Sequence, residues 1–238
     1  MEFSVIIPAL NEEKCIENCI NSVLNQTYPR DRYEIIVSDG ASKDKTAKIA
    51  KKYADKVVVS KKRGIWWGRN YGAKFAKGKY LVFIDADTII DRDYLKTVHP
   101  YLERGYVGVS TGFRFSERNL RIRLIEGYLT LFWKIASATG FKQLLGFSLC
   151  IPKKTFKEVG GFKDFYMEDA MINRDLKKFG KIKYISEKKV TTSPRKYEKQ
   201  GFILASLRYN KCEIVDILRS RSKLLHKKLS SEKYLEIR

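Results

Sequence analysis

Residues 1–112 alternate short apolar runs with amphipathic segments, and this alternation restricts the fold more than any other feature of the sequence. The apolar runs have the length of buried strands, and they cover residues 3–7, 34–37, 57–59, 80–84 and 107–110. The segments between them repeat apolar residues at helical spacing, and Asn11 and Ser42 are placed to cap two of the helices. This order predicts βαβ units and therefore an α/β fold with a mostly parallel sheet flanked by helices.

The pattern changes after residue 112. Residues 113–198 predict a mixture of elements, with helices over 120–137, 153–159 and 168–179 and strands over 146–151 and 182–185. Apolar residues at helical spacing continue through 200–229. We therefore divide the chain into a βαβ half (1–112), a second half of the same domain (113–198) and a basic amphipathic helical tail (199–238).

Positive charge is concentrated in the second half of the chain. The chain has 48 Lys and Arg against 27 Asp and Glu, a formal net charge of +21, and residues 113–238 carry +16 of it. Such a surface predicts an anionic partner, whether nucleic acid, anionic lipid or a phosphorylated substrate. The alternative is a solvated surface rich in Lys and Glu, as many thermophile proteins have.

Basic residues also occur on helix 120–138 and on the tail, away from their apolar faces. They are Arg121, Arg123, Lys134, Arg208, Lys211, Arg219, Arg221, Lys223, Lys227 and Lys228. This pattern predicts contact with an anionic membrane, and ordinary helix packing with solvated lysines is the alternative. Because no apolar window is long enough to span a bilayer and the first residues do not resemble a signal peptide, we expect a cytoplasmic protein, peripheral on the inner face of the cell membrane.

Polar residues follow three of the predicted strands directly. In a parallel sheet, ligands bind beyond the carboxyl ends of the strands, so residues 8–11, 38–40 and 85–87 should share one rim. Asp85 and Asp87 are suited to Mg²⁺ or Mn²⁺, because hard cations prefer carboxylate oxygens and substrate phosphates complete the shell; an acidic helix start is the alternative. A carboxylate at Asp39 can accept hydrogen bonds from a base or ribose, or it can serve a turn before Gly40.

Three further groups are candidates for chemistry. Arg69 can pair with a phosphate or a carboxylate, which makes it a candidate nucleotide-binding residue, and an exposed arginine is the alternative. Trp66 and Trp67, which are adjacent in the sequence, offer a stacking surface or core packing. Glu168 and Asp169 follow a glycine turn, and a carboxylate placed there can act as the general base for an attacking hydroxyl. Capping of a helix start is the alternative for this acidic pair.

Taken together, these residues resemble the family 2 glycosyltransferases, which have the nucleotide-sugar-dependent GT-A fold. The matching segments are SVIIPALNEE at 4–13, IIVSDGASKDKT at 35–46, GRNYGAKFAKGKYLVFIDAD at 68–87, GGF at 160–162 and ED at 168–169. They occur in the family's order. The resemblance implies a Rossmann-like central sheet, with a nucleotide-sugar-binding half (1–112) and an acceptor-binding, catalytic half (113–198).

The resemblance also implies roles for individual residues. The residues that would bind the nucleotide are Pro8, Leu10, Glu12, Val37, Asp39, Asp85, Ala86 and Arg195. Among these, Asp39 would contact the base and Arg195 the leaving diphosphate. Asp87, with Asp85, would hold the divalent cation, Mg²⁺ or Mn²⁺. Asp169 would deprotonate the acceptor hydroxyl, and Glu168 would lie beside it.

The implied reaction is an inverting, metal-assisted single displacement from a nucleoside-diphosphate sugar to an acceptor hydroxyl. A UDP-sugar is the favoured donor and GDP-mannose the other candidate; the acceptor is a glycan or a polyprenyl-linked glycan. The Q-x-x-R-W motif of processive synthases is absent from the sequence, so we expect a non-processive enzyme. The alternatives are a sugar nucleotidyltransferase and a non-enzymatic nucleic-acid-binding protein, but nucleic acid is not the expected partner.

Overall fold

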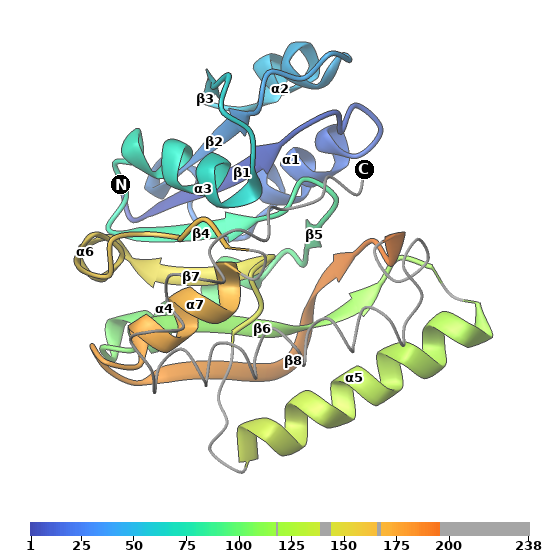
Figure 1. Cartoon of the computed structure of the whole chain (residues 1–238), viewed down its shortest axis with the longest axis vertical. Coiled ribbons are helices and arrows are strands. Elements are labelled where there is room, and N and C mark those ends of the chain that lie inside the picture. The colour runs from blue at the N-terminus through green and yellow to red at the C-terminus, as the bar shows by residue number, and fades with distance from the viewer. Residues whose placement is uncertain (118, 139–143, 166–167, 196–238) are drawn as a thin grey trace, which may run out of the picture.

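The computed structural model describes residues 1–117, 119–138, 144–165 and 168–195 (Figure 1). Within these residues, eight strands form one sheet in the order β3-β2-β1-β4-β7-β6-β8-β5. The strands are β1 (Phe3–Ala9), β2 (Tyr33–Asp39), β3 (Lys56–Val59), β4 (Tyr80–Ile84), β5 (Ile89–Ile90), β6 (Gly108–Phe115), β7 (Ser148–Pro152) and β8 (Ile182–Thr192). The helices are α1 (Ile16–Leu24), η1 (Arg30–Arg32), α2 (Thr46–Tyr53), α3 (Ile65–Lys74), α4 (Tyr94–Glu103), α5 (Leu120–Ala138), α6 (Lys153–Glu158) and α7 (Glu168–Leu176).

β1 lies at the centre of a parallel unit. It pairs in parallel with β2 on one side and with β4 on the other, and β3 extends the sheet beyond β2. Every residue of β1 and β2 is buried, and α3 packs against both strands on the face toward the viewer (Figure 1). A strand covered on both faces requires a nearly continuous apolar sequence. The structure therefore confirms the α/β fold predicted from the alternation.

The two helix caps predicted from the sequence are wrong, because α1 begins at Ile16 and α2 at Thr46. Asn11 adopts a left-handed φ of 54°, and its backbone N–H donates a hydrogen bond to Ser42 Oγ at 2.9 Å. The side-chain oxygen of Asn11 in turn accepts from the backbone N–H of Lys43. Both predicted caps thus join the loops after β1 and β2, since those loops lie side by side at the edge of the sheet.

The other strands depart from a simple parallel array. β7 is antiparallel to β4 and β6, so a strand from later in the chain separates the predicted fifth strand, β6, from β4. β8 extends well beyond the predicted 182–185, and its register against β6 is irregular around Gly112. The two-residue strand β5 pairs with β8. The sequence did not predict β5, because so short a run has no periodicity.

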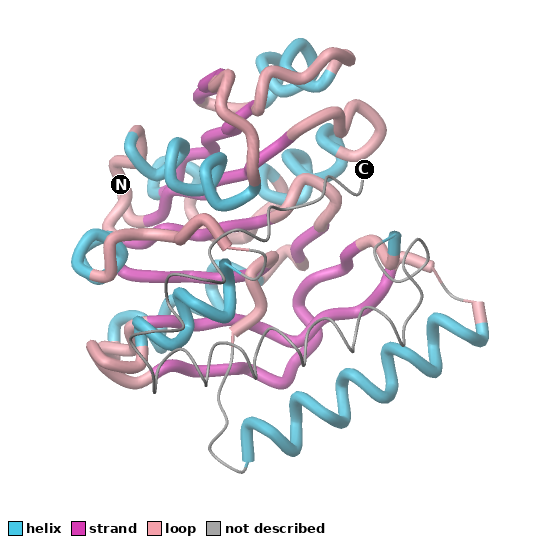
Figure 2. Tube along the Cα trace, in the orientation of Figure 1, coloured by secondary structure: helices cyan, strands magenta, loops and turns pink. Residues whose placement is uncertain are grey.

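α5 lies at the edge of the molecule, beside β6 (Figure 2). Ile122 and Ile125 are buried on its inner face, and the Glu126 carboxylate accepts the backbone N–H of Phe115 in β6 at 2.8 Å. Among the described residues, α5 and the other helices are all too short or too polar to cross a bilayer. The predicted tail, 199–238, lies outside the described residues, so the proposed division of the chain stays a prediction.

Candidate active site

The carboxyl ends of β1, β2 and β4 form one edge of the sheet, as the parallel pairing requires. The last residue of β1, Ala9, is in register with Asp39 at the end of β2. β4 ends at Ile84 and is followed directly by Asp85. Segments widely separated in the sequence therefore place their acidic side chains along a single rim, which is the edge where an α/β sheet binds ligands.

Asp39 is buried and fixed by the loop that follows it. Its carboxylate accepts the backbone N–H of Ser42 at 3.0 Å and the Ser42 hydroxyl at 2.5 Å. A carboxylate offers about four lone-pair sites, so Asp39 retains capacity to accept N–H or O–H groups from a ligand. The neighbouring loop is held in the same way, since the backbone N–H of Glu12 donates to Thr46 Oγ1 at 2.8 Å.

Arg69 connects this rim to the second acidic pair. It is only 1% exposed, its Nη2 donates to Asp85 at 2.8 Å and its Nη1 donates to Glu168 at 2.6 Å. Its guanidinium also lies over the ring of Phe162, 5.0 Å from the centroid. The sequence offered phosphate or carboxylate as its partner, and in this structure the partners are carboxylates. Arg69 thus acts on the site by positioning both acids, and its predicted nucleotide contact stays a prediction.

Glu168 and Asp169, at the start of α7, differ in their surroundings. Glu168 is buried, and this burial raises its pKa; the charge of Asp169 adds to the rise and the charge of Arg69 opposes it. Asp169 is half-buried and accepts the backbone N–H of Ala170 at 2.9 Å. Because Glu168 is held by Arg69, Asp169 is the more accessible carboxylate and the better placed to accept a proton from a substrate.

Two residues without a predicted role make contacts near this acidic pair. Asn70 follows Arg69 on α3, and it both donates to the carbonyl of Phe162 at 2.8 Å and accepts its N–H at 2.9 Å. Gly146 lies against Asp169, and a Cβ built on it would come within 2.8 Å of the Asp169 Cβ. Neither contact has a local sequence signal, because each joins residues more than twenty positions apart.

The cation site predicted at Asp85 and Asp87 has suitable donors. One oxygen of Asp85 is engaged by Arg69, whereas Asp87 pairs with Arg195 at 2.7 Å. Burial raises the pKa of Asp87, the charge of Asp85 adds to the rise, and Arg195 opposes it. Arg195 also pairs with Glu12 at 3.0 Å. Because an ion pair engages one oxygen of Asp85 and one oxygen of Asp87, a divalent cation bound by this pair would need substrate oxygens to complete its shell.

The apolar residues predicted to bind the nucleoside differ in how far a ligand can reach them. Val37 and Ala86 are buried, and Pro8 is buried in β1 and packs close to Gly68 of α3. Leu10 is partly exposed, in the loop after β1. The side chain of Val37 therefore lies in the core, whereas Leu10 is placed where a ligand can reach it.

Comparison with known proteins gives the family. The family model described as "Glycosyl transferase family 2" matches residues 4–155, which is more than half of the chain. The chain belongs to glycosyl transferase family 2. The resemblance inferred from the motifs is thereby confirmed.

Curated relatives in the family match part of the chain. A poly(ribitol-phosphate) beta-N-acetylglucosaminyltransferase, TarS, of Staphylococcus aureus is 32% identical over 115 residues, 46% of this chain and 20% of that protein. A Methanococcus voltae enzyme, named dolichyl N-acetyl-alpha-D-glucosaminyl phosphate 3-beta-D-2,3-diacetamido-2,3-dideoxy-beta-D-glucuronosyltransferase, is 36% identical over 100 residues, 39% of this chain and 31% of that protein. The matched segment thus spans a third or less of these two relatives.

Two solved structures have the same fold. The mannosyltransferase PcManGT from Pyrobaculum calidifontis, in complex with GDP-Man and Mn²⁺, has a TM-score of 0.66 at 23% identity, covering 81% of this chain and 56% of that one. The S. aureus TarS fragment 1–349, in complex with UDP-GlcNAc, has a TM-score of 0.65 at 21% identity, covering 81% of this chain and 58% of that one. These likenesses confirm the predicted GT-A fold.

The tryptophan pair on α3 makes its own contacts in this family 2 chain. Trp67 donates to Ser60 Oγ at 2.7 Å, and its ring stacks with Tyr71 at a centroid distance of 6.1 Å. The ammonium of Lys62 lies over both indoles, 4.5 Å from Trp66 and 4.3 Å from Trp67. These contacts explain the pair structurally, and stacking on a sugar or base stays a prediction.

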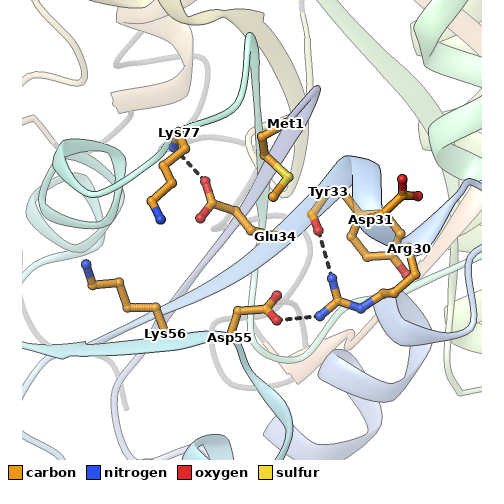
Figure 3. Close-up of a pocket in the computed structure, with 8 residues that line it drawn as sticks. All are labelled: Met1, Arg30, Asp31, Tyr33, Glu34, Asp55, Lys56 and Lys77. Carbon is orange, nitrogen blue, oxygen red and sulfur yellow. Dashed lines mark hydrogen bonds and ion pairs between the residues drawn. The ribbon is translucent and has the colours of Figure 1, made fainter.

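A pocket elsewhere on the surface is distinct from the acidic rim (Figure 3). Its lining includes Met1, Tyr33 and Lys56, which lie at the amino ends of β1, β2 and β3. Arg30 crosses it to pair with Asp55 at 2.5 Å. Because ligands of such sheets bind at the opposite, carboxyl edge, this pocket is not the candidate active site.

Proposed function

We propose that this chain is an inverting, non-processive glycosyltransferase that moves a sugar from a nucleoside-diphosphate sugar to an acceptor hydroxyl. The observation that carries the proposal is the bridge formed by Arg69, which links Asp85 on the donor rim to Glu168 beside Asp169. A displacement reaction needs the donor and the base in a fixed relation, and a buried arginine that pairs with a carboxylate on each side supplies it. Membership of glycosyl transferase family 2 supports the same reaction class.

The roles of the residues follow from their surroundings. Asp39, with Leu10, binds the nucleoside, and Asp85, Asp87 and Arg195 lie on the diphosphate side. A divalent cation held by Asp87 would supply positive charge to the departing diphosphate. Asp169 takes the proton of the acceptor hydroxyl, the acceptor oxygen forms a bond to the anomeric carbon, and the bond from that carbon to the diphosphate breaks. One such displacement inverts the anomeric configuration.

The donor and acceptor are proposed from the chemistry of relatives. Structures similar to this chain were solved with UDP-GlcNAc and with GDP-Man and Mn²⁺, so a UDP-sugar or GDP-mannose with Mn²⁺ or Mg²⁺ is the proposed donor. Relatives are named for transfer to poly(ribitol phosphate) and to a dolichyl phosphate sugar. We take a glycan, including a polyprenyl-linked one, as the acceptor class, and the cytoplasmic side of the membrane as the place of reaction.

Asp169→Asn tests the reaction. The variant should keep the rise in melting temperature that UDP or GDP gives with Mn²⁺, because the donor contacts are intact. It should transfer sugar about 10²- to 10⁴-fold more slowly, because the base is lost. Thermal shift with a panel of nucleoside diphosphates and a turnover assay, with the product's anomeric configuration read by NMR, measure both effects.

Asp164→Asn is the matched control, because Asp164 is an exposed carboxylate in the loop preceding α7. It should retain both binding and turnover. If Asp169→Asn transfers sugar at the wild-type rate, Asp169 is not the general base. If none of the nucleotides shifts the melting temperature of the wild-type protein, the donor assignment fails as well.

A further inference from the structure

One face of α5 exposes large apolar side chains along its length. Nine such side chains are exposed among the described residues, and five of them lie on this helix, each 55–72% exposed: Leu120, Leu124, Tyr128, Leu131 and Ile135. At 3.6 residues per turn they fall within about 80° of one another around the helix axis. We call these five residues the α5 stripe. Concentration on a single line distinguishes the stripe from the scattered apolar residues of an ordinary surface.

The opposite face of α5 is already in use. Ile122 and Ile125 pack toward the body of the protein, and the one acidic side chain of the helix, Glu126, is turned inward to bond Phe115 in β6. Ile122, Ile125 and Glu126 therefore belong to the face by which α5 packs against β6, and this face is opposite the exposed leucines of the stripe. α5 therefore has one apolar face buried against its own protein and a second apolar face directed outward. The outward face gains free energy only if it is also removed from water.

Exposed basic residues flank the stripe. Arg121, Arg123 and Lys134 are all exposed, and helical geometry places them on either side of the apolar line, within about 100° of its centre. No acidic residue of α5 lies on this outward side, since Glu126 is buried. Apolar side chains bordered by cations are the pattern of a helix that lies in the interface of an anionic bilayer.

We propose that the α5 stripe is a membrane-binding surface, with Leu120, Leu124 and Leu131 inserted among the lipids and the flanking cations against anionic phospholipid headgroups. The positive charge beside the stripe favours an anionic bilayer over other partners. A second copy of this chain would bring the same cations against the stripe, and residues 196–238 carry eleven Lys or Arg against five Asp or Glu, so both repel the flanks of α5. A nucleic-acid backbone would leave the leucines in water, whereas an anionic bilayer accommodates both kinds of side chain.

This proposal does not depend on the proposed enzyme activity, because the test needs neither donor nor acceptor. The full chain is sedimented with two kinds of vesicle. One is pure phosphatidylcholine, and in the other about one third of the lipid is phosphatidylglycerol, which gives the surface negative charge. Binding to the anionic vesicles should be at least about tenfold tighter. The double variant Leu124→Ser with Leu131→Ser should lose about tenfold or more of that binding, because each inserted leucine transfers apolar area from water into the bilayer.

The control removes equally exposed apolar side chains from elsewhere. Val59→Ser with Phe179→Ser, at residues 51% and 47% exposed, should bind the vesicles like the wild type. Arg123→Gln with Lys134→Gln should weaken binding to the anionic vesicles about thirtyfold and leave binding to phosphatidylcholine unchanged, since each of the two cations contributes on the order of 1 kcal/mol near the surface. Urea unfolding of every variant establishes that the fold is intact.

Three results would overturn the proposal. The first is equal binding of the wild type and the leucine variant to anionic vesicles. The second is a wild-type dimer that the leucine variant dissociates, seen by sedimentation velocity, which would make the stripe an interface between copies. The third is a leucine variant that is strongly destabilised yet still binds vesicles, which would mean that the stripe packs within its own chain.

Discussion

The two halves of the sheet are built differently. In the first half, β1, β2 and β4 are parallel and buried along their whole lengths. In the second half, β7 runs antiparallel to its neighbours, and β8 is long and irregular in register. The donor rim belongs to the uniform half, and the candidate base, Asp169, belongs to the irregular one.

The difference matters because the site needs both halves. The ladder between β4 and β7 joins their backbones, but the acidic side chains are aligned by a few polar contacts across the boundary. Arg69 links Asp85 to Glu168, and Asn70 holds the backbone of Phe162. The second half is thus positioned against the uniform donor half by these side-chain contacts. Substitutions can remove the contacts one at a time and measure what each contributes.

Arg69→Met should have the largest effect on stability. It leaves the buried Glu168 carboxylate without its cation, and removing one partner of a buried ion pair costs about 3–5 kcal/mol. The loss should appear as a lower free energy of unfolding in urea. Addition of Glu168→Gln to the variant should recover part of it, because the uncompensated charge is then gone.

Arg30→Met is the matched control for this change. Arg30 pairs with Asp55 at 2.5 Å, but the two side chains are 45% and 39% exposed, and such surface pairs contribute about 0–1 kcal/mol. If Arg69→Met costs no more than Arg30→Met, the buried bridge does not stabilise the junction of the two halves.

The same contrast explains how much the sequence could predict. Continuous apolar runs predicted β1, β2 and β4 within two residues at each end. These strands are buried at every position, so their sequences are apolar almost throughout. The caps at Asn11 and Ser42 were misplaced. The antiparallel pairing of β7 and the existence of the two-residue β5 were not predicted. Each of these depends on pairing with a distant segment, which overrides local propensity and leaves no periodic signal.

The candidate site was predictable to a similar extent. Strand ends located Asp39, Asp85 and Asp87 on one rim, because the geometry of parallel sheets is general. The family resemblance, rather than spacing, suggested a role for Arg195. The bridge from Arg69 to Glu168 was not foreseen, since the two residues are 99 positions apart and charge alone does not choose between a phosphate and a carboxylate.

Gly146→Ala should produce an intermediate effect and separate catalysis from donor binding. The new methyl group would approach Asp169 Oδ2 to 3.2 Å and its Cβ to 2.8 Å, so Asp169 must shift. Overpacking of this kind costs about 1–3 kcal/mol, and displacement of a base by about 1 Å lowers turnover by up to about 10²-fold. Donor binding by thermal shift should change less than turnover, because the closest contacts of the new methyl group are with Asp169, and Arg69 Nη1 lies slightly farther away at 3.3 Å.

Gly127→Ala provides the comparison for that change. Gly127 lies on α5 and a Cβ built there meets no atom within 4 Å, so alanine should stabilise the helix by about 0.5–1 kcal/mol. Equal turnover in Gly146→Ala and the wild type would show that Asp169 tolerates the methyl group without moving from its working position.

Beyond the loss of its pair with Arg69, Glu168→Gln should have a smaller effect, a change in the pH dependence of stability. Burial raises the pKa of Glu168 above its unfolded value of 4.5, so the folded protein keeps this proton to higher pH than the unfolded chain does. Between 4.5 and the folded pKa, stability therefore falls as pH rises, by at most about 1.4 kcal/mol per pH unit. Urea unfolding over a pH series should show that Glu168→Gln flattens this decline.

Glu103→Gln, in the first half, should change the profile with the opposite sign. Hydrogen bonds from Lys79 and Tyr80 lower the pKa of Glu103, so its stabilising contribution is present above its unfolded pKa and is lost as pH falls through the folded value. The profiles of the two variants should therefore diverge from the wild type at different ends of the acidic range. If Glu168→Gln follows the wild-type profile throughout, burial does not raise the pKa of the Glu168 carboxyl in the folded protein.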